Sequence, residues 1–349
     1  MKRLLLISYY FPPLGLGGTQ RVAKFVKYLP LYGWQPTVVT VKTIAYWASD
    51  LSLMRDVAAA EIVRTESLDP QRLLARWRRN KGHVAGLRRD NSAAAFVYQN
   101  ILSRIFTPDN KILWRPCALS AIAGLMRRSQ FDAVMTTSPP HSVHLIGLKV
   151  AQKYKLPWLA DFRDGWAGSH VVYEPNRRYY HRNLILQNKV VSSANAVVTC
   201  SPGIESSLCS RESQRSKFHL ITNGFDEEDF PQMMEKRERR DDFTLCYCGT
   251  INKWANPAPF LKALKQALAI EPPLTQKLTV QFIGLDTLGS LAADVDRLGL
   301  SGVVQIMGHL PHDRAVAEMS RADALLLLAQ ARETDTFIPG KTFEYIGSG

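Results

Sequence analysis

A cluster of acidic and basic side chains stands in the stretch DFRDGW, directly after the apolar residues of PWLA. Asp161, Arg163 and Asp164 would therefore lie at the carboxyl end of a strand, where open parallel sheets bind their ligands. An arginine there can neutralise a phosphate, and Asp161 can hold the guanidinium group through two hydrogen bonds. The alternative interpretation is a buried ion pair with a structural role.

A glycine-rich turn follows the first apolar run, in YYFPPLGLGGTQR. Gly15, Gly17 and Gly18 let the backbone approach a ligand closely, and the helix that follows offers free N–H groups suited to phosphate. The spacing is not G-x-G-x-x-G, and Val41 and Lys42 stand where a dinucleotide site needs an acid. The pattern therefore argues against an NAD site, and a turn without any ligand is the alternative.

The stretch FIPGKTFEYIGSG predicts a Pro-Gly turn and then the first turns of a helix. Lys341 and Glu344 stand three residues apart, so they would share one face near the N-terminus of that helix. A basic and an acidic group placed together at a helix start can contact a polar ligand.

Strand-like and helical patterns alternate along the chain and must position these residues. In TQRVAKFVKYLPLYG, for example, Val22, Phe25 and Leu29 recur at spacings of three and four, which is typical of a helix. Repeated strand–helix units predict parallel sheets with right-handed crossovers. In the first part of the chain the strand-like runs lie at residues 3–10, 36–42, 60–67, 132–138, 158–164, 196–201 and 218–224.

The alternation restarts after the charged stretch EKRERRDD, with FTLCYCG, LTVQFIG, VVQIMG and ALLLLA as strands and helical patterns between them. We therefore predict an α/β protein with two doubly wound, Rossmann-like domains that face a cleft. The predicted domains are residues 1–234 and 243–349, with 235–242 as a linker.

Length and composition are those of a globular protein, since 349 residues with 46% apolar content form most simply two domains. The five cysteines are scattered and odd in number, which favours reduced thiols and a cytoplasmic setting. The apolar run in MKRLLLISYYFPP is short and lacks a small-residue cleavage pattern, so we do not interpret it as a signal peptide. No apolar stretch reaches the roughly 18 residues that span a bilayer.

The net charge of +13 is unevenly distributed. Between Arg72 and Arg89, the segment RLLARWRRNKGHVAGLRR is rich in basic residues, has no acid, and includes Leu73, Leu74 and Trp77. Such a segment can bind an anionic membrane, where each basic residue contributes about 1 kcal/mol, or the phosphates of a nucleic acid. A solvated helix face is the third interpretation, and charge alone leaves all three open.

In chain order, PPLGLGGTQRV, PWLADFRDGW, VVTCSPGI, ITNGFDEEDF, CYCGT, FIG and IPGKTFEYIGSG resemble the motifs of glycosyltransferase family 4, which has the GT-B architecture. The resemblance covers essentially the whole chain. It implies that the N-terminal domain takes the acceptor, that the C-terminal domain takes a nucleotide-sugar donor, and that transfer retains the anomeric configuration. It also implies no metal and no cofactor, and the Asp-x-Asp at Asp294 and Asp296 falls in a helical pattern.

By that resemblance, Glu344 holds the ribose hydroxyls of the donor nucleotide, and Lys341, in a P-x-K-x-x-E arrangement, meets the leaving diphosphate. The first acid of the family's E-x7-E pattern would fall at Thr336. Glu333 or Asp335 is therefore expected to contact the donor sugar, and a solvated loop acid is the alternative.

A second departure from the family follows Gly249, itself an expected donor contact. The family usually carries an Arg and a Lys on the diphosphate where this chain has Thr250 and Ala255, and Lys253 is near but out of register. The expected phosphate contacts are therefore Gly17, Gly18, Lys253 and Lys341.

In the first domain, Arg163 stands where many family members have a histidine, and we expect it to contact the donor phosphate, with Asp161 holding its guanidinium group. The resemblance implies that the departing phosphate takes the acceptor proton, so no protein base is assigned. His141 and His144, at a predicted helix start in TTSPPHSVHLIG, are expected to line the acceptor site. A capping or packing role is the alternative.

Together these features predict a cytoplasmic glycosyltransferase, peripheral at the inner face of the membrane. It would move a sugar from a UDP- or GDP-sugar to a glycan or lipid-linked acceptor in surface polysaccharide synthesis. One alternative is a nonenzymatic GT-B-like protein, because Thr250, Ala255 and Thr336 are losses at donor-binding places. The other is a basic nucleic-acid-binding protein, although no helix-turn-helix, zinc or aromatic RNA-binding signature is present.

A family 4 fold would continue past YIGSG with further strands and helices. We therefore expect the second domain to be truncated and to expose an apolar face, and we expect this chain to be poorly soluble and weakly active or inactive.

Overall fold

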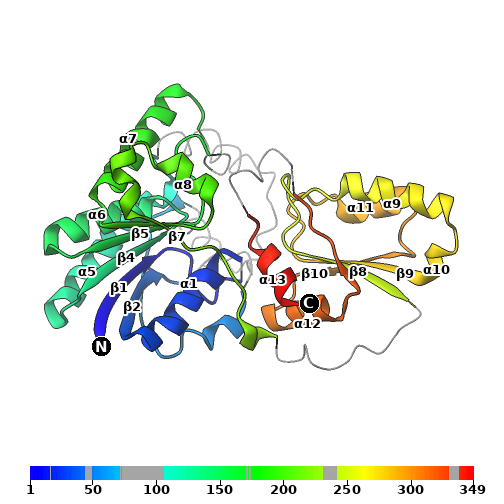
Figure 1. The fold of residues 1–349 in the computed structure, drawn as a ribbon, viewed down its shortest axis with the longest axis horizontal. Coiled ribbons are helices and arrows are strands. Elements are labelled where there is room, and N and C mark those ends of the chain that lie inside the picture. Colours follow the sequence, from blue (N-terminus) through cyan, green and yellow to red (C-terminus); the bar gives the residue numbers. More distant parts are fainter. Residues whose placement is uncertain are drawn as a thin grey trace, which may run out of the picture. The chain divides into compact units, whose positions relative to one another are not determined.

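The computed structural model describes residues 1–15, 17–43, 49–70, 72, 106–169, 172, 174–230, 242–329 and 338–349 (Figure 1). They form two compact units, Met1–Thr222 and Asn223–Gly349. Of the predicted linker at 235–242, all but Asp242 lies outside the described residues.

A seven-stranded parallel sheet forms the centre of the first unit, in the order β3-β2-β1-β4-β5-β6-β7. Each strand overlaps one of the seven predicted runs. The order reverses between β1 and β4, and ligands bind in open α/β sheets at such switch points. The strands are β1 (Lys2–Ser8), β2 (Trp34–Val41), β3 (Glu61–Thr65), β4 (Ala133–Ser138), β5 (Trp158–Phe162), β6 (Ala196–Thr199) and β7 (Phe218–Leu220).

Helices cover both faces of this sheet because the strands are apolar on both sides. Leu4 and Leu6 of β1 pack with the apolar side chains of α1, whereas Leu5 and Ile7 pack with those of α5 to α8. This alternation is the period of two expected for a strand. The helices are α1 (Gly17–Tyr28), α5 (Arg115–Arg128), α6 (Ser142–Tyr154), α7 (Arg177–Ser193) and α8 (Pro202–Leu208).

Short 3-10 helices connect several of these elements. In the first unit they are η1 (Leu29–Tyr32), η2 (Ser52–Met54), η4 (Asn110–Trp114) and η5 (Glu212–Lys217), and η6 (Glu227–Asp229) lies in the second.

The second unit has a four-stranded parallel sheet in the order β10-β9-β8-β11. Its strands are β8 (Phe243–Cys248), β9 (Leu278–Ile283), β10 (Val304–Gly308) and β11 (Ala324–Leu325). Its helices are α9 (Ala258–Ile270), α10 (Leu274–Lys277), α11 (Leu291–Leu298), α12 (His312–Arg321) and α13 (Lys341–Gly347). The predicted α/β class, with a parallel sheet in each unit, is confirmed. Within the described residues, no helix has the length and apolarity to cross a membrane.

Candidate functional site

The carboxyl ends of β8 and β9 meet through two glycines. Gly249 has φ +147° and Gly284 has φ +135°, conformations that residues with a side chain rarely adopt. The Gly249 N–H donates to the carbonyl of Ile283 at 2.8 Å. A Cβ at Gly284 would lie 2.1 Å from the carbonyl oxygen of Gly249, so this edge of the sheet must be bare backbone.

Lys341, at the start of α13, lies against this bare edge. A Cβ at Gly249 would stand 2.8 Å from the Lys341 Nζ, so the glycine makes room for the ammonium group. Lys341 Nζ donates to the Tyr247 hydroxyl at 2.7 Å and lies 4.0 Å from the centre of the same ring. The Tyr247 hydroxyl in turn donates to the carbonyl of Thr250 at 3.1 Å. Burial lowers the pKa of Lys341 to about 8.

Tyr247 is a site residue that the sequence analysis did not identify. It is fully buried in the core of the second unit, so its position in the CYC run reads as ordinary packing. Its hydroxyl is the part that reaches the strand end. The available signal was a tyrosine, rather than a phenylalanine, two positions before a glycine at a strand end, because a buried hydroxyl needs a partner.

Glu344, one turn into α13, is hydrogen-bonded to His312 of α12, with 2.7 Å between Glu344 Oε1 and His312 Nε2. The His312 side chain is 12% exposed and the Glu344 side chain is 17% exposed, so both are mostly covered. His312 is a second residue that the sequence analysis missed, because 32 positions separate it from Glu344. Lys341 and Glu344 thus both have partners near the start of one short helix.

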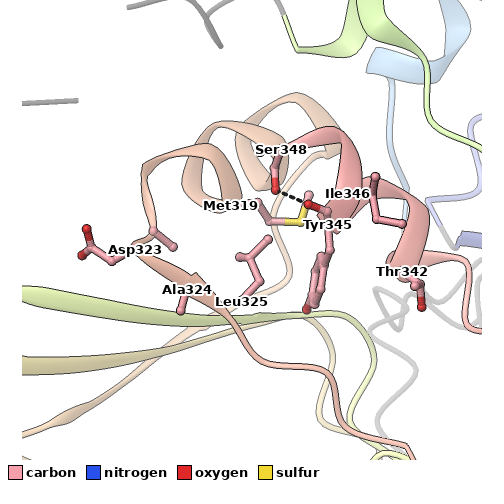
Figure 2. Close-up of a pocket in the computed structure, with 10 residues that line it drawn as sticks. Met319, Asp323, Ala324, Leu325, Thr342, Tyr345, Ile346 and Ser348 are labelled. Carbon is pink, nitrogen blue, oxygen red and sulfur yellow. Dashed lines mark hydrogen bonds between the residues drawn. The ribbon is translucent and has the colours of Figure 1, made fainter. Parts of the chain in front are cut away.

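Tyr345 anchors α13 to the sheet. Its hydroxyl accepts from the Cys248 N–H at 2.8 Å and lies 3.2 Å from the carbonyl oxygens of Cys248 and Leu326. Its ring also lines an open pocket with residues of α12 and β11, among them Met319 and Leu325 (Figure 2). Chain segments far apart in sequence therefore fix the position of Lys341.

Of the other donor contacts expected in this unit, Lys253 is exposed, and its ammonium group lies 4.0 Å from the centre of the Trp254 ring. Ala255 belongs to the core of the unit. Glu333 lies outside the described residues, as do Asp335 and Thr336. No contact in the structure bears on the role expected for Glu333.

In the first unit, Arg163 follows β5 and lies against the first turn of α1. Its Nε donates to the carbonyl of Ser138 at 2.8 Å, and its Nη2 to that of Pro139 at 3.3 Å. A Cβ at Gly18 would lie 2.7 Å from Nη1, so a side chain there would displace the guanidinium group. Arg163 is only 8% exposed. The structure thus joins two parts that were predicted separately, Arg163 and the glycine-rich turn with Gly17 and Gly18.

Asp161 does not hold Arg163, and that part of the prediction is wrong. Its carboxylate pairs with Arg21 of α1 at 2.9 Å and accepts from the Thr137 hydroxyl at 2.7 Å. Arg21 also donates to the carbonyls of Ile221 and Thr222. Residues 161 and 163 would share a face only if the strand continued, but β5 ends at Phe162 and the Arg163 guanidinium group turns to the carbonyls at the end of β4. The buried Asp161, at 0% exposure, pairs instead with Arg21, which projects from α1.

His141 and His144 are packing residues in this structure, which is a correction to the expected acceptor role. The His144 ring lies 4.2 Å from Phe162, and His141 stacks on Trp166 at 4.9 Å. The two histidines are 4% and 0% exposed. Burial lowers the pKa of His141 to about 3 and that of His144 well below its usual value, so both rings are neutral at pH 7.

Two further groups have structural partners. Asp294 pairs with Arg297 and Asp296 accepts from Ser301, both on or next to α11. Arg72, the first residue of the predicted basic segment, is buried at 5% exposure, with its Nε 3.7 Å from Asp69. Arg72 therefore does not belong to the surface that was expected to bind a membrane. The rest of that segment, residues 73–89, lies outside the described residues.

Comparisons with known proteins agree with this architecture. Residues 71–229 match the family model described as Glycosyltransferase Family 4. The HepE structure from Anabaena in complex with UDP aligns with 93% of this chain and 73% of its own, at 14% identity and a TM-score of 0.55. WaaG, a glycosyltransferase involved in lipopolysaccharide biosynthesis, aligns with 99% of this chain and 79% of its own, at 12% identity and a TM-score of 0.59. Sucrose-phosphate synthase from Thermosynechococcus elongatus aligns with 93% and 75%, at 16% identity and a TM-score of 0.61.

A search of curated proteins by sequence gives no significant match. The fold is nevertheless that of the GT-B glycosyltransferases. The resemblance to glycosyltransferase family 4 is confirmed, and the family model covers residues 71–229.

Proposed function

We propose that this protein is a retaining glycosyltransferase that moves a sugar from a UDP- or GDP-sugar to a glycan or lipid-linked acceptor, without a metal ion. The observation that carries the proposal is the ammonium group of Lys341, held by Tyr247 at the bare backbone of Gly249. A half-buried cation beside backbone that carries no side chain suits a diphosphate. HepE, which shares the fold, has been crystallised with UDP and with UDP-glucose, which supports a uridine nucleotide as the first donor to test.

In this reaction the bond between the anomeric carbon and the donor phosphate oxygen breaks, and a bond to the acceptor oxygen forms on the same face. The acceptor proton passes to the departing phosphate. Lys341 meets the negative charge that grows on the diphosphate, and Glu344 accepts hydrogen bonds from the ribose hydroxyls. In the first unit, Arg163 and the glycine turn with Gly18 supply a second cationic contact for donor phosphate.

The acceptor and the location are part of the same proposal. We place the enzyme at the inner face of the membrane, in surface polysaccharide synthesis, with the basic segment at residues 73–89 as one contact to anionic lipid. The support for this placement is the sequence of that segment, whose seventeen residues include several Arg and Lys and no acidic residue.

The test is a panel of nucleotides and nucleotide sugars, measured by thermal shift and by transfer assay. UDP or GDP should stabilise the protein in the presence of a chelator, by about 2.7 kcal/mol at one hundred times Kd, and NAD should not. Lys341→Ala should lower the rate at saturating donor, whereas Glu344→Ala should chiefly raise the donor KM. Stabilisation by NAD alone, or a strict need for a divalent ion, would overturn the proposal.

The same panel tests the nonenzymatic alternative, which Thr250 and Ala255 favour because basic residues are absent at those places. Nucleotide binding without transfer or donor hydrolysis, for every sugar tested, would support that alternative.

A further inference from the structure

The side chains of His312 and Glu344 join two helices of the second unit. His312 is the first residue of α12, and Glu344 lies in the first turn of α13. The contact is made by His312 Nε2 and Glu344 Oε1. An ionised carboxylate only accepts hydrogen bonds, so Nε2 is the donor when Glu344 is ionised. One oxygen of Glu344 is therefore held by a residue from another element.

The second carboxylate oxygen of Glu344 is available to a ligand. Within the part of the chain that the structure describes, Oε2 is neither hydrogen-bonded nor buried. A carboxylate with one oxygen held and the other open can accept hydrogen bonds from hydroxyl groups that approach from one direction. The contact with His312 therefore decides how Glu344 meets a ligand.

The position of His312 is set by the buried face of α12. Ala315, Val316 and Met319 follow it at spacings of three, four and seven residues, so they lie on the same face of the helix. All three are buried. Val316 and Met319 belong to an apolar cluster against which Tyr345 of α13 packs, and Met319 and Tyr345 line the same pocket (Figure 2). Packing between α12 and α13 therefore brings His312 to Glu344.

Both sides of the contact are thus held by their neighbours. A glutamate side chain that is free to change rotamer loses that freedom when it binds a ligand, and the loss weakens binding. Glu344 has already lost much of it in the folded protein, because His312 holds Oε1. We propose that His312 is a positioning residue, which holds Oε1 of Glu344 so that Oε2 accepts hydrogen bonds from the ribose hydroxyls of the donor nucleotide.

This inference rests on the proposed role of Glu344 and adds the residue that prepares Glu344 for it. The alternative is that His312 only ties α12 to α13. Such a tie would affect stability and would affect all nucleotides alike. A positioning role instead affects nucleotides that carry ribose hydroxyls and spares those that lack them.

The experiment measures binding of UDP and of 2′,3′-dideoxy-UDP to the full chain by calorimetric titration. The ratio of the two Kd values is the ribose selectivity. His312→Gln and His312→Asn form a matched pair with the same amide group, which lies at the distance of Nε2 from the backbone in Gln and only at that of Nδ1 in Asn. His312→Ser is a second variant without a donor in reach, for use if His312→Asn is too unstable. Glu344→Ala reports the ribose contact itself.

The wild-type chain should bind UDP at least about tenfold more tightly than the dideoxy analogue, because hydrogen bonds to a charged group are strong. Glu344→Ala should bring this ratio close to one. His312→Asn should reduce it to less than about threefold, and His312→Gln should keep it within about twofold of wild type. In transfer assays, His312→Asn should raise the donor KM and change the rate at saturating donor by less than about twofold.

A wild-type ratio in His312→Asn, together with a ratio near one in Glu344→Ala, would overturn the positioning role and leave the proposed function intact. Equal losses of ribose selectivity in His312→Asn and His312→Gln would also overturn it, because the packing of the ring and not its hydrogen bond would then matter. A ratio near one in the wild-type chain would overturn the ribose contact of Glu344 and the inference with it. Failure of the wild-type chain to bind UDP or GDP would contradict the proposed function itself.

Discussion

Lys341 is a cation whose surroundings oppose its charge. Burial lowers its pKa to about 8, below the usual value near 10.5. The penalty for a charged Lys341 in the folded protein is fully present below pH 8 and is relieved as pH rises toward 10.5. The Lys341 ammonium group has therefore lost part of its hydration in the folded protein. A bound anion would replace the lost hydration with a direct charge–charge interaction.

We predict that UDP affinity falls as pH rises above about 8, because the free protein then loses the ammonium proton. The fall should approach tenfold per pH unit, since one proton must be taken up with the ligand. Calorimetric titration between pH 7 and 9.5 measures it. Lys341→Arg should flatten the profile, because its guanidinium group stays charged. A wild-type profile that is already flat would show that Lys341 does not contact the nucleotide.

The hydroxyl of Tyr247 gives a second test at the same place. Tyr247→Phe keeps the ring under the ammonium group and removes only the oxygen that fixes Lys341 Nζ and bonds to Thr250. We expect UDP to bind about fivefold more weakly, which corresponds to one hydrogen bond of about 1 kcal/mol. A parallel loss of thermal stability larger than this, with unchanged affinity, would assign the hydroxyl a structural role.

The ion pair of Arg21 and Asp161 is buried, and its energetics differ from those of a surface pair. Arg21→Met leaves the Asp161 carboxylate at 0% exposure with the Thr137 hydroxyl as a remaining partner. We expect a loss of about 3 to 5 kcal/mol in the free energy of unfolding, measured in urea. Arg297→Met, which breaks an exposed pair, is the control and should cost less than about 1 kcal/mol. Similar effects of the two substitutions would mean that water reaches Asp161.

At the scale of elements, the strands end where the chain can leave the sheet without side chains. Gly249 follows β8, Gly284 follows β9, and Gly308 is the last residue of β10; all three have positive φ. The first two allow β8 and β9 to approach, and Gly249 also admits Lys341. In the first unit the corresponding element is the start of α1, where Gly18 admits Arg163.

We predict that Gly284→Ala destabilises the second unit by more than about 3 kcal/mol, because its Cβ would meet the Gly249 carbonyl and its φ suits glycine alone. Gly302→Ala is the control, since a Cβ there meets nothing within 4 Å. Urea unfolding of both variants measures the difference. An equally small effect at both positions would show that the strand ends can move apart at little cost.

Across the whole molecule, we expect UDP binding to change hydrogen-exchange protection differently in the two units. UDP should increase hydrogen-exchange protection at residues 247–250 and along α13, where Tyr247, Lys341 and Glu344 lie. The helices α5, α6 and α7 of the first unit should show no change with UDP. Exchange measured with and without UDP, with a chelator present in both samples, tests this difference. Protection by UDP confined to the first unit would contradict the donor assignment.

The amino-acid sequence by itself determined the strands, the helices and their order. Alternating apolar runs are local patterns, and local hydrogen bonding with burial of one or both faces converts them into secondary structure. The same patterns put Lys341, Glu344 and Arg163 at the ends of elements, where ligands bind in α/β folds.

Only the tertiary structure decided which partner each charged or polar group has. Asp161 pairs with Arg21, 140 residues away, although Arg163 is two residues away. The roles of Tyr247 and His312 and the burial of His141 could likewise not be predicted from the sequence. They depend on where a distant helix or strand end lies. Desolvation makes these choices energetically decisive, since a buried charge must have a partner, and packing between segments far apart in the chain selects it.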